Sequence, residues 1–285
     1  MNRKTWLITG ASSGLGKALA EYVLARGDRV VAAARSTAAT TEMAARHPDT
    51  ALALPLDVSD PEQRIAGLRA AEERFGGIDI LVNNAAIDFI GALEEQEETD
   101  YRALFEVNFF GAVALTRAVL PGMRRRRSGV IVNVSSMDGL ASLPANGYYS
   151  ASKFALEGFT EALWQEIEPL GLHAMVIQPG SFRTGIEHRT KASGQPIDDY
   201  AATAGAFRTI MDRLTPEMFP GDPEKAAEVI YAEATAPEPR HWVVLGSDAQ
   251  RRIGFKLDQL RAEFDAGENT ALSTDFPGAA DNAVL

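Results

Sequence analysis

Short apolar, β-branched runs alternate with longer amphipathic stretches along almost the whole chain of 285 residues. This alternation is typical of consecutive strand–helix–strand units, whose strands lie parallel in one sheet. It predicts an α/β fold, a doubly wound parallel sheet of about seven strands with helices on both faces. The predicted strands are Thr5–Thr9, Arg29–Ala33, Ala51–Leu56, Ile80–Asn83, Val130–Ser135, Ala174–Gln178 and Trp242–Leu245. The predicted helices cover residues 14–26, 60–75, 99–125, 149–170, 223–236 and 247–265.

The length of the chain is enough to bury one sizeable core. We therefore expect one domain over residues 1–246, followed by a C-terminal helix and a polar tail at 247–285. Residues 185–222 have no clear strand periodicity. Connections of that length are usually lids, binding loops or disordered segments.

Composition excludes several classes of function. The net charge of −11 argues against a nucleic-acid partner, because phosphate binding needs clustered positive charge. The chain has no cysteine, so disulfides, thiolate metal sites and a cysteine nucleophile are excluded, and no metal-ligand spacing is visible. No signal peptide and no apolar run long enough to span a bilayer is recognisable, so we expect a cytoplasmic protein without a membrane partner.

A glycine-rich turn follows the first predicted strand and opens the first helix, with the sequence Thr9-Gly10-Ala11-Ser12-Ser13-Gly14-Leu15-Gly16. Glycines at such a turn let the backbone approach a pyrophosphate closely. The phosphate then rests on the helix N-terminus, where unpaired N–H groups point. The spacing Gly-x-x-x-Gly-x-Gly differs from the common Gly-x-Gly-x-x-Gly fingerprint, but its position between strand and helix predicts a dinucleotide site.

The end of the second predicted strand indicates which dinucleotide. The fingerprint expects an acidic residue there to bind the adenosine ribose, whereas this chain has Ala33-Ala34-Arg35-Ser36. An arginine can bind a 2′-phosphate with its planar fork of donors. Arg35, helped by Ser12 or Ser36, therefore favours NADP(H) over NAD(H), and the alternative is a surface arginine without a ligand.

A tyrosine and a lysine stand one helical turn apart in Tyr149-Ser150-Ala151-Ser152-Lys153. The i,i+4 spacing puts both side chains on one helix face. Tyrosine is a poor base near neutrality, and we expect the neighbouring ammonium of Lys153 to lower its pKa. Upstream, Ser136 follows a predicted strand, and its hydroxyl could stabilise a developing alkoxide at the carboxyl edge of the sheet.

These ordered motifs together resemble the short-chain dehydrogenase/reductase family, in its compact single-domain type with a Rossmann-like fold. The resemblance is strong over residues 4–184 and continues weakly to about 246. The family's glycine turn matches Thr9 to Gly16, its Asn-Asn-Ala-Gly motif matches Asn83-Asn84-Ala85-Ala86, and its Pro-Gly segment matches Pro179 to Thr184. By this resemblance, the catalytic residues are Asn108, Ser136, Tyr149 and Lys153. The cofactor contacts, from the turn and the resemblance together, are Gly10, Ser12, Ser13, Gly14, Leu15, Gly16, Arg35, Asp57, Val58, Asn83, Ala85, Tyr149, Lys153, Pro179, Gly180, Phe182 and Thr184.

The family's mechanism implies that hydride passes to a substrate carbonyl carbon while Tyr149 delivers a proton to its oxygen. Lys153 also holds the nicotinamide ribose, Ser136 orients the carbonyl, and Asn108 holds a water that leads to Lys153. The segment 185–222 would form the substrate lid, and its apolar residues suggest a hydrophobic carbonyl compound. The extension past residue 246 leaves a homodimer, a homotetramer or a monomer open.

Three functions remain in competition. The leading one is an NADP(H)-dependent enzyme that interconverts a ketone or aldehyde and an alcohol. The second is an NAD-linked alcohol or hydroxysteroid-type dehydrogenase. The third is a nucleotide-sensing protein without catalysis, which we would expect to lack Tyr149 or Lys153.

Overall fold

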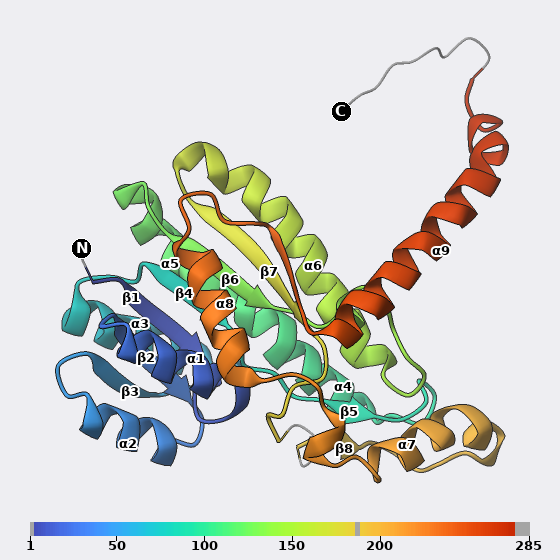
Figure 1. Ribbon diagram of the computed structural model, residues 1–285, viewed down its shortest axis with the longest axis horizontal. Helices are drawn as coiled ribbons and strands as arrows, with labels where there is room; N and C mark the ends of the chain where they lie inside the picture. The colour runs from blue at the N-terminus through green and yellow to red at the C-terminus, as the bar shows by residue number, and fades with distance from the viewer. Residues whose placement is uncertain (1–2, 186–188, 277–285) are drawn as a thin grey trace.

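Seven strands form one parallel sheet in the order β3-β2-β1-β4-β6-β7-β9. The computed structural model describes residues 3–185 and 189–276, and Figure 1 shows the helices packed around this sheet. The strands are β1 Thr5–Thr9, β2 Arg29–Ala34, β3 Ala51–Pro55, β4 Ile80–Asn83, β6 Val130–Val134, β7 His173–Pro179 and β9 Trp242–Leu245. The predicted sheet is confirmed, and each strand end lies within one residue of its predicted position.

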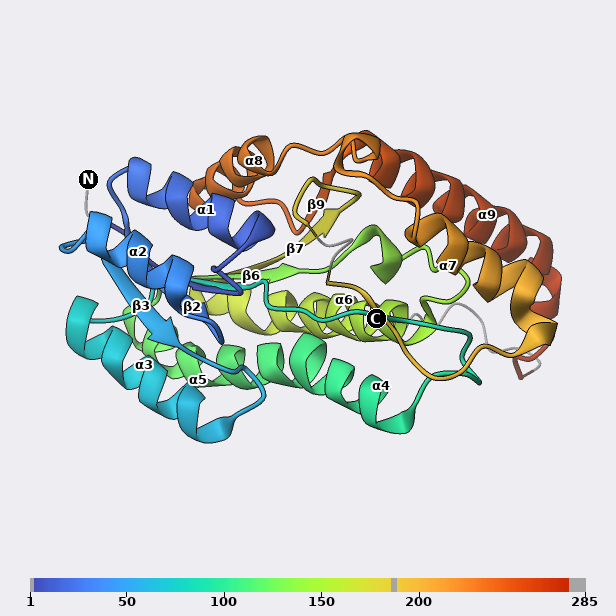
Figure 2. The same cartoon turned by 90° about the horizontal axis from the view of Figure 1, so that it is seen from below.

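Helices cover both faces of the sheet, which is why its strands are apolar almost throughout. Helices α1, α2 and α8 pack on one face, and α3, α5 and α6 pack on the other, as Figure 2 shows from the side. The α-helices are α1 Gly14–Ala25, α2 Ala38–Arg46, α3 Pro61–Phe75, α4 Glu98–Phe105, α5 Gly111–Arg126, α6 Gly147–Ile167, α7 Ala206–Met211, α8 Pro223–Thr235 and α9 Ser247–Leu272.

Helix ends follow local sequence signals. Asp60 accepts hydrogen bonds from the amides of Glu62 and Gln63, and Asp222 repeats this cap at the start of α8. A proline follows each of these aspartates, where the missing N–H costs nothing. Gly76 adopts the left-handed conformation that ends α3, with φ of 83°. These caps fix where the connections to the sheet edge begin.

Four features differ from the sequence expectation. The predicted helix 99–125 is interrupted by a π-helical turn at Glu106–Phe110 between α4 and α5. Helix α2 was not predicted, because it buries only Thr40 and Met43 and so shows little apolar periodicity. Helix α9 continues to Leu272, beyond the predicted end at Asp265. The two-residue strands β5 Phe89–Ile90 and β8 Lys191–Ala192 form a separate small sheet.

The predicted lid is joined to the body through that small sheet. Beyond β8 it contains the 3₁₀ turn Asp198–Tyr200, the π turn Ala201–Gly205, α7 and the 3₁₀ turn Pro216–Met218. Residues 186–188 of the predicted lid and 277–285 of the predicted tail lie outside the described residues.

One helical run among the described residues, Glu98–Arg126, is long and apolar enough to cross a membrane by length and composition. This corrects the expectation that the chain holds no such run. Leu115, Val119 and Met123 of this run are buried in the core beside the sheet. Packing against the sheet therefore accounts for its apolar character, as in the core helix of a globular protein.

Candidate active site

The glycine turn between β1 and α1 is tightly folded. Gly10 and Gly14 have φ values of 66° and 55°, in the left-handed region that favours glycine. A Cβ on Gly16 would lie 2.6 Å from the carbonyl oxygen of Gly10. Ser13 precedes α1 without capping it through its side chain. The first N–H groups of α1 are therefore available to a phosphate.

Asn84 and Thr9 fasten this turn to the end of β4. The Asn84 side-chain amide donates to the carbonyl of Thr9 at 2.9 Å, and the Thr9 hydroxyl accepts from the amides of Asn84 and Ala85 at 2.9 and 3.0 Å. Sequence reasoning assigned Asn84 only to a motif and gave it no place at the site. The adjacent Asn-Asn pair after a buried strand is the signal that pointed to it.

Ser136 lies just past the carboxyl end of β6, as predicted. Its hydroxyl donates to the Asp138 carboxylate at 3.2 Å and accepts from the Asp138 amide at 3.1 Å. Asp138 also pairs with Arg252 of α9. The Ser136 hydroxyl is thus oriented by a short turn that an ion pair holds in place.

Asn108 lies in the π-helical turn between α4 and α5. Its side chain accepts from the Ile87 amide at 2.8 Å and donates to the Ile87 carbonyl at 2.9 Å. It also donates to the Ser152 hydroxyl at 3.3 Å, and that hydroxyl donates to the Tyr149 carbonyl at 2.7 Å. Such turns are frequent at functional sites. In this turn, one asparagine connects the loop that follows β4 with the first turn of α6.

Tyr149 and Lys153 share one face of α6, and Lys153 reaches back to the sheet. The Lys153 ammonium donates to the Val134 carbonyl at 2.8 Å and lies 5.7 Å from the centre of the Tyr149 ring. Ser136 lies beside the Tyr149 phenol, and a hydrogen bond between them acts against the net rise of the Tyr149 pKa. The structure therefore brings Ser136, Tyr149 and Lys153 together. Asn108 is connected to the Tyr149 backbone by hydrogen bonds through the Ser152 hydroxyl.

The protonation of this group differs from the sequence expectation. Burial of the phenol, and next the negative charges of Asp88 and Asp138, raise the pKa of Tyr149 above its usual value. We expected Lys153 to lower this pKa; in this structure the pKa is raised instead, and the Lys153 ammonium donates to the Val134 carbonyl. Burial lowers the pKa of Lys153 itself to about 8.

Two further buried carboxyl groups surround the site. Burial raises the pKa of Asp88 to about 6, although Thr190 donates to it at 3.1 Å. Glu157 lies one turn after Lys153 on α6, and Gln178 donates to both its oxygens at 3.1 and 3.0 Å. Burial raises the pKa of Glu157 to about 7. Sequence reasoning missed both, since a lone acidic residue carries no motif.

The predicted cofactor residues fall into two groups. Arg35 is exposed just after β2, and Gly14 and Thr184 line a cavity of about 360 Å³ beside α1. Val58 is buried against Gly111, and Asp57 accepts bonds from Ser59. The remaining turn and edge residues lie where predicted, at the glycine turn, after β4 and after β7: Gly10, Ser12, Ser13, Leu15, Gly16, Ala85, Pro179, Gly180 and Phe182.

Asn83 is the exception among these assignments. Its side chain is buried and donates to Asn133 at 2.8 Å and to Thr116 at 3.1 Å. Asn133 in turn donates to Thr160 of α6 at 2.8 Å. The side chain therefore joins β4 and β6 with α5 and, through Asn133, with α6, and the cofactor contact predicted for Asn83 stays a prediction.

The segment after β7 is fixed by the first turn of α9. The Asp248 carboxylate accepts from the Ser181 amide at 2.7 Å, and it approaches Gly180 so closely that a Cβ there would clash with it. Farther along, Arg189 donates to the Ser13 hydroxyl and, at 3.1 Å, to the Thr184 carbonyl. Arg189 thus places a guanidinium over the glycine turn, a contact that no sequence motif indicated.

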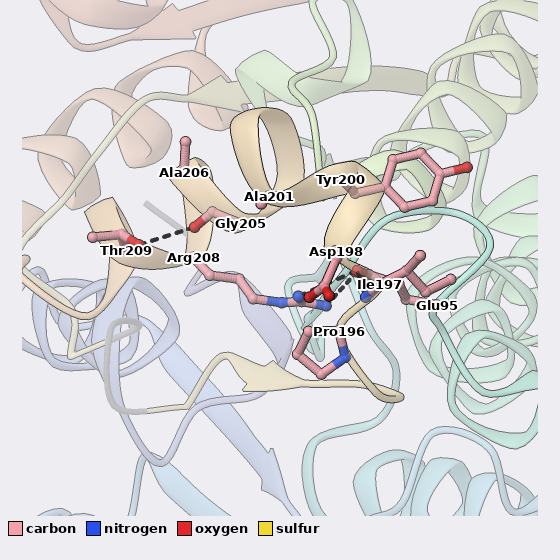
Figure 3. A pocket seen from close by; sticks show the side chains of 10 residues that line it. All are labelled: Glu95, Pro196, Ile197, Asp198, Tyr200, Ala201, Gly205, Ala206, Arg208 and Thr209. Atoms are coloured by element: carbon pink, nitrogen blue, oxygen red, sulfur yellow. Dashed lines mark hydrogen bonds and ion pairs between the residues drawn. The ribbon is translucent and has the colours of Figure 1, made fainter.

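The lid is anchored by one buried ion pair. Arg208 of α7 pairs with Glu95, and Figure 3 shows it reaching toward that residue across a cavity of about 280 Å³. Glu95 also accepts from the amides of Ile197 and Ala92 at 2.8 and 2.6 Å. Burial opposes its ionisation, yet these bonds and Arg208 hold the Glu95 pKa below its usual value. None of the four candidate catalytic residues lines this cavity.

Titratable side chains in the described part of the chain form no group of three that could hold a metal ion.

The family profile described as short chain dehydrogenase matches residues 4–194. An oxidoreductase of Botryotinia fuckeliana is 32% identical over 95% of this chain and 99% of its own length. A short-chain dehydrogenase of Streptomyces avermitilis, of known structure, is 39% identical, covers 96% of this chain and 99% of its own, and superposes with a TM-score of 0.89. A 3-ketoacyl-(acyl-carrier-protein) reductase of Brucella melitensis, solved with NADH, is 27% identical over 85% of this chain and 96% of its own, with a TM-score of 0.70. The chain therefore belongs to the short-chain dehydrogenase family and is an oxidoreductase of the class that interconverts alcohol and carbonyl groups with NAD or NADP.

Proposed function

We propose that this protein is an NADP(H)-dependent carbonyl reductase in which Tyr149 is the general acid. The observation that carries the proposal is the meeting of Ser136, Tyr149 and Lys153 at the carboxyl edge of β6. In open α/β sheets this edge is where ligands bind. The dinucleotide, when bound, supplies the hydride that reaches the carbonyl carbon.

The residues of this chain fit a dinucleotide. The glycine turn leaves no space for side chains at Gly10 and Gly16, and the side chain of Ser13 does not cap the first N–H groups of α1. These groups would hold the pyrophosphate, and the exposed Arg35 would bind a 2′-phosphate. The Brucella reductase was solved with NADH, so the preference for NADP(H) rests on Arg35 alone. Tighter binding of NADH than of NADPH would contradict it.

The protonation state of the site is the one that a proton donor needs. A raised pKa keeps the Tyr149 phenol protonated at neutral pH, so it can donate a proton to the oxygen of a reacting carbonyl. The Ser136 hydroxyl can hydrogen-bond that same oxygen as negative charge develops on it. Lys153, with a pKa of about 8, can return a proton toward Tyr149. Asn108 positions the first turn of α6 through Ser152.

The test is a pair of substitutions at neighbouring tyrosines. Tyr149→Phe should lower kcat for NADPH-dependent ketone or aldehyde reduction by about 10²–10⁴-fold and leave NADPH affinity within a few-fold. Tyr148 is the matched control, because its hydroxyl donates only to the Leu93 carbonyl, at 3.3 Å, and its ring stacks on Tyr101. Tyr148→Phe should keep nearly full activity. Near-normal turnover by Tyr149→Phe would refute the assignment.

Cofactor binding without turnover of any carbonyl or alcohol would instead support the nucleotide-sensing alternative. Preferred turnover of alcohols with NAD would support the NAD-linked dehydrogenase.

We further propose a small, hydrophobic carbonyl substrate, since Tyr200 and Phe207 of the lid pack on an apolar cluster. We propose a cytoplasmic location from the absence of cysteine, and no nucleic-acid or membrane partner.

A further inference from the structure

Helix α9 is fixed to the body only through its first turns. Asp248 accepts from the Ser181 amide, and Arg252 pairs with Asp138. Ala249 and Ile253 are buried beside the body. From Phe255 onward every side chain of α9 is exposed or half-buried, and Figure 1 shows this outer part leaving the molecule.

The outer part carries an apolar stripe. Leu257, Leu260, Phe264 and Ala271 follow Ile253 at spacings of three, four and seven residues, which places them on one face of a helix. Leu257 is 52% exposed and Phe264 is 71% exposed. The stripe continues the face that Ala249 and Ile253 bury against the body. Covering this stripe would remove its apolar side chains from water and so stabilise the helix.

The charges beside the stripe argue against a lipid surface. Helices that lie on membranes are rich in Lys and Arg along their polar face. The second half of α9, from Leu260 on, is mostly acidic, with Glu263, Asp265 and Glu268 against the single basic residue Arg261. The whole chain has a net charge of −11, which an anionic membrane would repel.

The same charges are complementary to a second copy of α9 that runs in the opposite direction. Before Leu260, the charged residues that α9 does not use on the body are Arg251, Lys256 and Asp258, two basic and one acidic, whereas acidic residues predominate after Leu260. An antiparallel copy places each basic half along an acidic half. Such a contact is related by a twofold axis, so it closes with two chains.

We propose that two copies of this chain associate through α9, stripe against stripe and antiparallel, with Leu260 near the twofold axis. The anchoring of α9 at Ser181 and Asp138 connects this contact with the segments that follow β7 and β6. The proposal does not depend on which cofactor or substrate the enzyme uses.

Phe264 and Phe255 provide a matched test. They are 71% and 75% exposed on the same helix, and nine residues, about two and a half turns, separate them, so they point in opposite directions. Light scattering and sedimentation of the full chain should show a dimer. Phe264→Glu should raise its dissociation constant by about 100-fold or more, whereas Phe255→Glu should leave it unchanged.

The absence of cysteine allows a second measurement. Under mild oxidation Leu260→Cys should form a disulfide-linked dimer, and Phe255→Cys should stay unlinked. A monomeric wild-type chain would overturn the proposal, including one whose α9 binds anionic vesicles. A dimer that persists in Phe264→Glu and does not cross-link in Leu260→Cys would also overturn it, because the copies would then meet elsewhere.

Discussion

Gly16 and Gly158 should respond in opposite ways to the same substitution. Both lie within helices, Gly16 in α1 and Gly158 in α6. A Cβ on Gly16 would lie 2.6 Å from the Gly10 carbonyl oxygen and would press on the Asn84 side-chain amide. A Cβ on Gly158 would meet no atom within 4 Å.

The magnitude follows from what each neighbour can do. The Gly10 oxygen belongs to the backbone of a left-handed residue, and the Asn84 amide is already bonded to Thr9, so neither can yield freely. Overpacking of this kind costs about 1–3 kcal/mol, or a fall in Tm of roughly 2–4 °C for each kcal/mol in a chain of this size. Gly158→Ala has no such cost and should gain about 0.5–1 kcal/mol from helix propensity.

Thermal unfolding and dinucleotide affinity would be measured on both variants. Gly16→Ala should melt several degrees below the wild type and lose most of its NADPH affinity, because the start of α1 is displaced from the turn. Gly158→Ala should melt at or above the wild type and bind NADPH normally. The reasoning is wrong if Gly16→Ala melts and binds NADPH as the wild type does.

Three other predictions follow from single side chains. Arg35→Ala should weaken the binding of NADPH by about 10- to 100-fold and leave the binding of NADH unchanged. Arg189→Ala, at the glycine turn, should weaken the binding of both dinucleotides equally. Calorimetric titration with each dinucleotide separates the two effects. Asp88→Asn removes a charge that raises the pKa of Tyr149, so the rising limb of the pH profile for alcohol oxidation should move to lower pH; an unmoved limb would contradict this coupling. The pKa of Glu157 is raised from an ordinary 4.5 to about 7. The free energy of unfolding should therefore fall as the pH rises between these two values, by up to about 3 kcal/mol. Glu157→Gln should flatten this dependence in thermal melts from pH 4.5 to 8.

The strands and helix caps could be predicted because their signals are local. A strand buried on both faces is a short run of apolar residues, such as Trp6 to Ile8 in β1. The observed ends of each strand therefore lie within one residue of the predicted ends. The caps at Asp60 and Asp222 depend on one side chain and the amides two and three residues further on. Helix α2 escaped prediction for the opposite reason, since it contributes little to the core.

The candidate site was predictable in its members but not in their contacts. Motif order places Ser136, Tyr149 and Lys153, and the topology of a parallel sheet brings them to one edge. The direction of each side chain depends on tertiary neighbours. Asn83 donates inward to Asn133, and Lys153 donates to Val134, and motif order indicated neither contact. The burial that raises the pKa of Tyr149 likewise comes from residues distant in sequence.

Helix α9 shows why an extension cannot be separated from the site that precedes it. The sequence sets it apart, because the sheet is complete at β9. Yet its first turn provides the carboxylate of Asp248, which occupies the space beside Gly180 and binds the Ser181 amide. One turn later Arg252 pairs with Asp138, the residue that orients Ser136. The segment after β7 that is expected to contact the cofactor and the serine expected at the substrate are therefore held by the same helix. A contact along the outer stripe of α9 would reach both through a rigid element, which loops alone could not provide.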